Sequence, residues 1–244
     1  MEYIYTFVGG HPDYVWLSKG AFYRQFGLTQ ALGYLERIRG TLAHEAKQER
    51  CKKCFYTGLR HAFADIDGLG KLYNGAFGPE STAPNAIAFG IRYLGWINDR
   101  YKNLFGLLFD MYRHGLMHTH LIRTARYKKN GRWYFLGWAM TDDRQDHLAL
   151  RTDGRRTLLI VSVPQLVDDT ISAIDRFGSD LRAAGPNSRL LSRFKRGYQG
   201  TSTTLREPEP LPPVKKAISM TRTPKRLRLK EYSRPGIDWI RRNT

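Results

Sequence analysis

The sequence has little cysteine and no long apolar run. Two cysteines, Cys51 and Cys54, are too few for a disulfide framework, which indicates a reducing compartment. No stretch reaches the roughly eighteen apolar residues of a membrane-spanning helix. The first twenty residues also lack the charged start and long apolar block of a signal peptide. We therefore expect a cytoplasmic protein that does not bind a membrane.

Several motifs of known chemistry are also missing. No GxxxxGK[ST] loop is present, which excludes a P-loop ATPase or GTPase, and no GxSxG serine elbow occurs. His44 and His61 lie seven residues from either end of CKKC at 51–54, a helical rise of about 10.5 Å, too far for one zinc ion. His147 follows an acidic run from Asp142, which leaves a divalent-cation site or a polar loop as alternatives. We expect no metal and no cofactor.

Acidic residues are scarce relative to basic ones. The chain has 22 Asp and Glu against 40 Lys and Arg, a formal net charge of +18 and a sequence pI near 10.1. Such a balance favours nucleic acid as a partner, and less often an anionic membrane surface. From Pro186 to Thr244, 15 basic residues stand against four acidic ones, or +11. This region, which contains EPEPLPP, is predicted to be an extended arm that orders on a partner; a solubilising tail is the alternative.

The first half of the chain has helical periodicity. Apolar residues recur at helical spacing over Gly27–Arg50, Cys54–Tyr73, Pro84–Trp96 and Tyr101–His120. Four helices joined by short links are typical of a bundle. We therefore predict a helical bundle over residues 1–120.

The pattern then changes to extended segments. LIRTARYK, the turn KNGR and WYFLGWAM predict a hairpin, and HLALR, TDGRR and TLLIVSV repeat that signature. Helical period returns over Val163–Ala184, with Pro164 in the first turn. The predicted fold is mostly α: a bundle, then a small antiparallel β-sheet with one helix (α+β) over 121–185 packed on the bundle. The basic, extended C-terminal arm over 186–244 completes it.

A cluster of basic side chains ends the fourth predicted helix, in YRHGLMHTH at 112–120. Arg113, His114, three mostly apolar residues and His118 form a pattern that resembles the signature of HEPN domains. These are helical-bundle proteins of prokaryotic defence and toxin systems, and the resemblance covers about residues 20–120. It implies a metal-independent endoribonuclease that acts as a homodimer with a shared cleft.

The residue types suit that chemistry. RNA supplies its own nucleophile, the 2′-hydroxyl, so an enzyme must move protons and neutralise the phosphate. Histidine titrates near neutrality and arginine donates to two phosphate oxygens at once. We assign acid/base catalysis to His118, the phosphate contact to Arg113 and a supporting role to His114. The alternatives are a helix end with exposed basic side chains and an inactive scaffold.

The helical geometry adds one condition. Five helical positions turn through about 500°, so Arg113 and His118 would point roughly 140° apart. A kink at Gly115 or a two-fold dimer would bring such groups to one phosphate. His120 stands where one toxin subgroup of the family has a tyrosine that a nucleotidyltransferase antitoxin modifies. That partner is therefore not expected, whereas another protein antitoxin or a nucleoprotein partner stays open.

The predicted hairpin combines aromatic and basic residues, which could stack and neutralise nucleic acid. Alternation places Trp133 and Phe135 on one face and Leu136 and Trp138 on the other, and either face could contact the bundle. The favoured function is RNA cleavage, with tRNA among the candidate substrates, in a toxin or anti-phage system. The alternative is a non-catalytic RNA- or DNA-binding subunit of a larger nucleoprotein assembly. The residues predicted to bind nucleic acid are Lys128, Lys129, Arg132, Arg193, Lys195, Arg196, Lys215, Lys216, Lys225, Arg226, Arg228 and Lys230.

Overall fold

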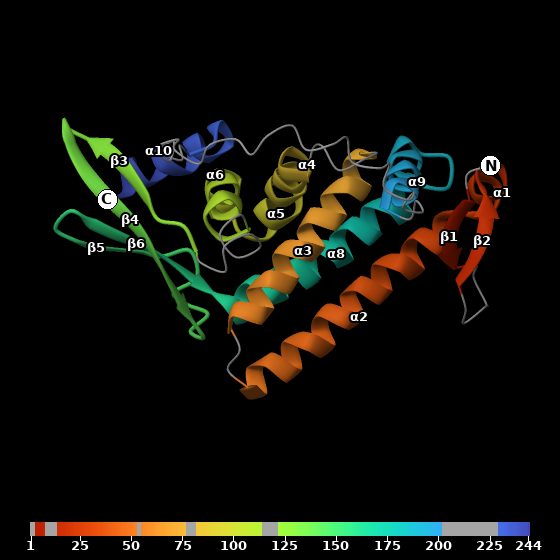
Figure 1. Ribbon diagram of the computed structural model, residues 1–244, viewed down its shortest axis with the longest axis horizontal. Helices are drawn as coiled ribbons and strands as arrows, with labels where there is room; N and C mark the ends of the chain where they lie inside the picture. The colour runs from red at the N-terminus through yellow and green to blue at the C-terminus, as the bar shows by residue number, and fades with distance from the viewer. Residues whose placement is uncertain (1–2, 8–13, 53–54, 77–81, 114–121, 202–228) are drawn as a thin grey trace, which may run out of the picture.

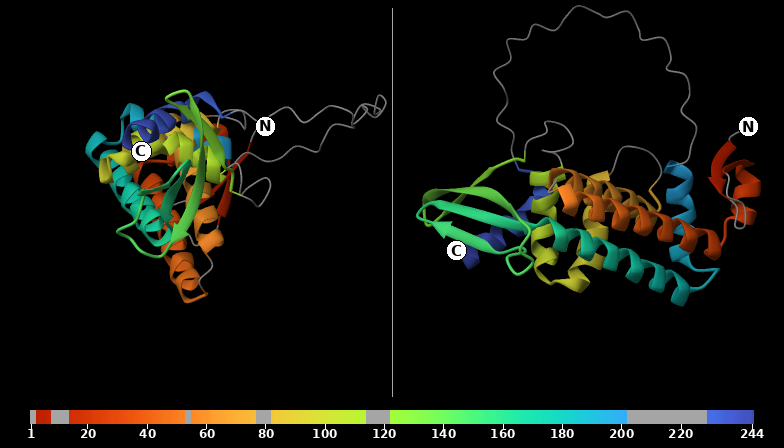
Figure 2. Two further views of the ribbon diagram at one scale, coloured as in Figure 1. Left: turned by 90° about the vertical axis from the view of Figure 1, so that its left-hand side faces the viewer. Right: turned by 90° about the horizontal axis from the view of Figure 1, so that it is seen from below.

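A computed structural model describes the chain over six ranges. These are 3–7, 14–52, 55–76, 82–113, 122–201 and 229–244. The described part is mostly helical, with a small four-stranded mixed sheet at one end and a two-stranded sheet at the other (Figures 1 and 2). Among its helices, none is long and apolar enough to cross a membrane.

Three long helices run side by side along the molecule (Figure 1). They are α2 (Leu28–Lys52), α3 (Phe55–Asn74) and α8 (Val163–Ala184). Each buries its apolar stripe in one shared core. These three helices confirm the periodicity of the sequence, and α8 has the predicted bounds because Ser162 caps it and Pro164 occupies its first turn.

The other predicted bundle helices are broken. The third consists of α4 (Thr82–Phe89), a π-helical turn η1 (Gly90–Leu94) and α5 (Gly95–Ile97). The fourth consists of α6 (Arg100–Leu108) and a second π-helical turn, η2 (Phe109–Arg113). The predicted remainder of the fourth helix, 114–120, lies outside the described residues.

The N-terminal region contains strands that the sequence did not indicate. Strands β1 (Tyr3–Phe7) and β2 (Tyr14–Ser18) pair in antiparallel fashion and lead into α1 (Lys19–Gln25). The prediction for this region considered helices alone. Alternating residues in a short segment are a weak signal beside the strong periodicity that follows.

The four-stranded sheet has the order β3-β4-β6-β5. Its strands are β3 (Ala125–Lys129), β4 (Arg132–Thr141), β5 (Leu150–Asp153) and β6 (Arg156–Ser162). Both predicted hairpins are confirmed, and Asn130 and Gly131 have the positive φ angles, 49° and 75°, of the predicted turn. The prediction of a wholly antiparallel sheet is wrong, because β6 inserts between β4 and β5 and runs parallel to β4.

Two stretches of the predicted extended arm are helical. Helix α9 (Arg189–Thr201) buries Leu191, Phe194 and Tyr198. Near the C-terminus, a 3-10 turn η3 (Glu231–Ser233) leads into α10 (Arg234–Asn243), which buries Ile237 and Ile240. The prediction of an extended arm is wrong for these stretches, because a few apolar residues at helical spacing suffice when a preformed core receives them. Residues 202–228 lie outside the description.

Helix α10 docks closely on α6. Gly106 lies against the backbone carbonyl of Tyr232, where an added Cβ would collide with the carbonyl oxygen. Buried Asp110 accepts hydrogen bonds from the backbone N–H of Lys230 (3.1 Å) and from the Ser233 hydroxyl (3.0 Å). These contacts hold the C-terminal helix beside the four-stranded sheet (Figure 1).

Candidate nucleic-acid interface

The outer face of the four-stranded sheet exposes two large aromatic side chains. Trp133 is 59% exposed and Phe135 is 47% exposed. Leu136, on the other face of the same strand, is fully buried. The burial pattern decides between the two faces that alternation left open: Trp133 and Phe135 face outward. A single exposed apolar residue is ordinary, but two neighbours on one strand face form a small aromatic surface.

Strand register surrounds these aromatic side chains with cations. Trp133 lies opposite Lys128, and Phe135 lies between Arg126 on β3 and Arg156 on β6. The guanidinium carbon of Arg126 is 4.5 Å from the centre of the Phe135 ring, a cation–π contact. All three cations are exposed. We call Arg126, Lys128, Trp133, Phe135 and Arg156 the outer sheet face.

Charge on this face is almost entirely of one sign. The segment from Ala125 to Thr141 contains no acid, and of its four cations Arg126 and Lys128 lie on this face. Asp153 on edge strand β5, opposite Arg156, is the nearest carboxylate in the strand register. A positive surface with aromatic side chains among the cations suits a polyanion whose bases can stack.

The inner face of the sheet is buried around Tyr127. Tyr127 stacks on Tyr134 with 5.5 Å between ring centres, and its hydroxyl lies 3.0 Å from the Thr157 hydroxyl. It also lies 3.4 Å from the hydroxyl of Thr244, at the end of α10. On the outer side, Leu158 is 39% exposed and covers the Cα of Gly137, where a Cβ would come within 2.8 Å of it. The side chains of the inner face thus join β3, β4, β6 and the C-terminal residue beneath the outer sheet face.

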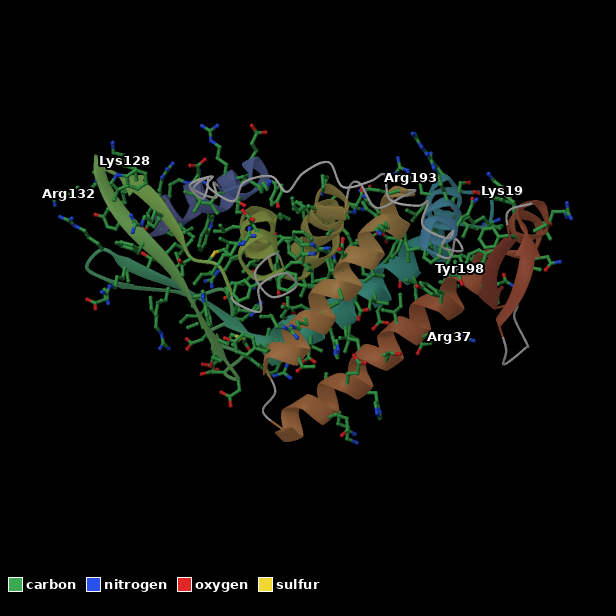
Figure 3. All side chains as sticks on the ribbon, in the orientation of Figure 1. Lys19, Arg37, Lys128, Arg132, Arg193 and Tyr198 are labelled. Atoms are coloured by element: carbon green, nitrogen blue, oxygen red, sulfur yellow. The ribbon has the colours of Figure 1, made fainter. Side chains whose placement is uncertain are left out.

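The predicted basic residues do not form one patch. Lys128 and Arg132 project from the tip of the β3–β4 hairpin, while Arg193 on α9 lies near the other end of the molecule (Figure 3). Lys195 donates to the carbonyl of Tyr23 (3.4 Å). Lys129 is half-buried, and Arg196 and Lys230 are exposed. Lys215, Lys216, Lys225, Arg226 and Arg228 lie outside the described residues. Arg126 and Arg156, which the predicted set omitted, belong to the face because of the register.

Of the three predicted catalytic residues, the structure describes Arg113. Its Nη2 donates to Oδ2 of Asp67 on α3 at 2.8 Å, and its guanidinium carbon lies 5.7 Å from the centre of the Phe109 ring. Both side chains are mostly buried, at 17% and 14% exposure. His114 and His118 lie outside the described residues. The sequence analysis did not identify Asp67. The only indication was the presence of an acidic residue among the apolar residues of α3.

The alternative cation site at His147 is not assembled. His147 is buried against Tyr101 and Asp169, away from the exposed Asp142 and Asp143. Within the described ranges, no three His, Cys, Asp or Glu side chains are grouped so that they could hold a metal ion. Cys54 lies outside those ranges.

Comparisons of this chain with protein-family models, with curated proteins and with solved structures find no match.

Proposed function

We propose that this protein binds single-stranded nucleic acid, RNA above all, on the outer sheet face. The observation that carries the proposal is the exposure of Trp133 and Phe135 on one strand face between Arg126, Lys128 and Arg156. Stacking of a base on an aromatic side chain contributes about 1–3 kcal/mol. Cations at this spacing would contact the backbone phosphates and release counterions.

The spacing of the two rings favours an unpaired strand. Residues two apart on a strand are about 6.6 Å apart, whereas bases within a duplex stack about 3.4 Å apart on one another. A duplex therefore offers no base face to Trp133 or Phe135, and single-stranded bases do. The Arg126 guanidinium over Phe135 extends this surface, because its plane also stacks on bases.

The test compares the wild type with a Trp133→Ala/Phe135→Ala variant. Fluorescence anisotropy with a labelled eight-residue oligouridine should show at least about a tenfold loss of affinity in the variant. A hairpin duplex should bind more weakly than oligouridine to the wild type. Trp96→Ala is the matched control, since Trp96 on α5 is 60% exposed but lies outside the sheet. Equal affinities of wild type and double variant would contradict the proposal.

As a second function, we propose that the protein cleaves RNA at Arg113 and His118 without a metal, as a HEPN-like homodimer. The supporting observation is the guanidinium of Arg113, which Asp67 and Phe109 hold in one place directly before the histidine-rich segment. An arginine with a fixed orientation can neutralise a transition-state phosphate with little reorganisation. A protein antitoxin or a larger nucleoprotein assembly would be the partner that controls it.

Cleavage is tested in EDTA with end-labelled tRNA and an unstructured RNA. Products with 2′,3′-cyclic phosphate ends that disappear in His118→Ala would support the second function. Replacement of His44, an exposed histidine on α2, is the matched control and should leave cleavage unchanged. Binding without cleavage by the wild type would reject this activity and leave the binding function intact.

A further inference from the structure

A polar cavity lies at the end of the sheet opposite the β3–β4 turn. Its volume is about 500 Å³, and side chains from three segments line it: Asn98 and Arg100 at the start of α6, Arg144 after β4, and Gln165 and Asp169 on α8. Parallel strands β4 and β6 both end there, and α8 begins there. Cavities at the carboxyl ends of parallel strands are frequent ligand sites in proteins.

Asp169 is among the residues that line the cavity and is almost fully buried. Its Oδ1 accepts a hydrogen bond from the Gln165 amide (2.7 Å), and its Oδ2 accepts one from the Tyr101 hydroxyl (2.9 Å). Each carboxylate oxygen has two acceptor sites, so both oxygens can accept a further hydrogen bond. Both of its hydrogen-bond donors are neutral, and the Arg144 guanidinium acts on it only through space, so the net effect of burial is to raise the pKa of Asp169.

The histidine beside it cannot supply a counter-charge. The backbone N–H of Ser162 donates to Nδ1 of His147 (3.1 Å), so the ring proton lies on Nε2, 2.6 Å from the Tyr101 oxygen. Burial lowers the pKa of His147 to about 4 and keeps the ring neutral at physiological pH. A ligand with N–H donors would therefore provide the interaction that the carboxylate lacks.

The rim of the cavity has the opposite chemistry. Arg100 is exposed and donates through Nη1 to the Leu148 carbonyl (3.3 Å), and no carboxylate in the described ranges pairs with it. Arg144 pairs with Asp168. A guanidinium without an acidic partner at the mouth of a cavity suits a phosphate.

We propose that this cavity binds a guanine nucleotide, with the base edge on Asp169 and the phosphate at Arg100. Guanine has two adjacent donors, N1–H and the 2-amino group, which match the two oxygens of a carboxylate. Adenine, cytosine and uracil each have an acceptor beside their donor on this edge, and a carboxylate would repel that acceptor. The amides of Asn98 and Gln165 can donate to the guanine O6.

The nucleotide site is separate from the outer sheet face. Trp133 lies near the start of β4 and the cavity begins beyond Thr141, a distance of eight residues or about 26 Å along the strand. The proposal therefore goes beyond the binding of a single strand on the sheet. A protein that lost oligouridine binding with Trp133→Ala/Phe135→Ala would still bind the nucleotide.

Isothermal titration calorimetry of the full chain with GMP, IMP and AMP tests the proposal. We expect GMP to bind at least about tenfold more tightly than AMP, with IMP between them because it lacks the 2-amino group. Asp169→Asn should remove the preference for GMP, since an amide presents only one acceptor. Arg100→Gln, a change at an exposed side chain, should weaken GMP but leave guanosine unchanged.

The controls separate these outcomes from unfolding. Arg182→Gln changes another exposed arginine, on the last turn of α8, and should leave GMP binding unchanged. Circular dichroism of every variant checks the fold. Equal affinities for GMP and AMP in the wild type, or no binding of either at millimolar concentration, would overturn the proposal without reference to any variant.

The guanine could belong to a free nucleotide or to an RNA strand. Both sources are compared in the Trp133→Ala/Phe135→Ala background, with GMP against the pentanucleotide UUGUU. Tighter Asp169-dependent binding of UUGUU identifies an RNA residue as the occupant, and tighter binding of GMP identifies the free nucleotide. If neither GMP nor UUGUU bound in a way that depends on Asp169, the site would be overturned.

Discussion

At the scale of single residues, burial determines the chemistry of the ionisable groups. His147 is nearly inaccessible, and its folded-state pKa of about 4 lies below the usual value of 6.5. A base with a lowered pKa binds protons more weakly in the folded state than in the unfolded state. Its stabilising contribution is therefore present above pH 6.5 and is lost as the pH falls towards 4.

This loss can be measured by urea unfolding at pH 7 and pH 5. From the two pKa values, His147 alone should lower the free energy of unfolding by about 2 kcal/mol at pH 5. Asp65, whose pKa burial raises to about 7, and Asp169 act in the opposite direction. The comparison with His147→Gln isolates the histidine, because this variant keeps both carboxylates. An equal change with pH in both proteins would contradict a neutral, buried His147.

The residue pattern predicted part of the outer sheet face. Alternation along WYFLGWAM correctly gave two faces to β4, but the choice between them depended on which face the helices cover. Arg156 was missed because it is distant in sequence from Phe135 and reaches it only through the parallel pairing of β4 with β6. The exposed position of Trp133 likewise follows from tertiary packing, which local sequence does not encode.

At the scale of elements, local signals fixed some boundaries and tertiary contacts fixed others. The Asn130–Gly131 turn and the N-terminal end of α8 follow from turn and capping residues. The π-helical turns η1 and η2 have no comparable signal in the sequence. Helix α10 was missed because its two buried apolar residues, Ile237 and Ile240, need the preformed surface of α6.

The hairpin turn provides a prediction at this scale. Gly131 has φ of 75° and nothing within 4 Å of a built Cβ, so Gly131→Ala should cost about 1–2 kcal/mol through backbone strain alone. Gly40 in α2 also has open space around a Cβ but lies in a helix interior, where alanine should stabilise by about 1 kcal/mol. Chemical denaturation of both variants measures the sign of each change in the free energy of unfolding. Stabilisation by Gly131→Ala would contradict the left-handed turn.

At the scale of the whole molecule, the C-terminal helix is part of the folded unit. Gly106 admits the backbone of Tyr232, and Gly236 lies where a Cβ would come within 2.6 Å of Leu107. The chain thus returns to α6 after the basic stretch beyond α9. The excess of basic residues over Pro186–Thr244 led to the prediction of an extended arm that orders on a partner, and composition alone gave no sign of the docked helices α9 and α10.

Removal of this docking should destabilise the protein in the absence of any partner. Gly106→Ala places a methyl group against the Tyr232 carbonyl and should lower the free energy of unfolding by about 1–3 kcal/mol. Deletion of 229–244 should have at least as large an effect in thermal melts. Gly68→Ala, at a helical glycine with open space around its Cβ, is the control. A melting temperature unchanged by Gly106→Ala and by the deletion would contradict a docked α10.

The central claim is that the outer sheet face binds a single strand through Trp133 and Phe135. The most direct measurement is ultraviolet cross-linking of oligouridine to the intact protein, followed by mass spectrometry of the attached peptide. We predict attachment within β4, at Trp133 or Phe135, and its loss when unlabelled single strand is added in excess. Attachment confined to α9 or to the region after it would place the binding site elsewhere and contradict this assignment.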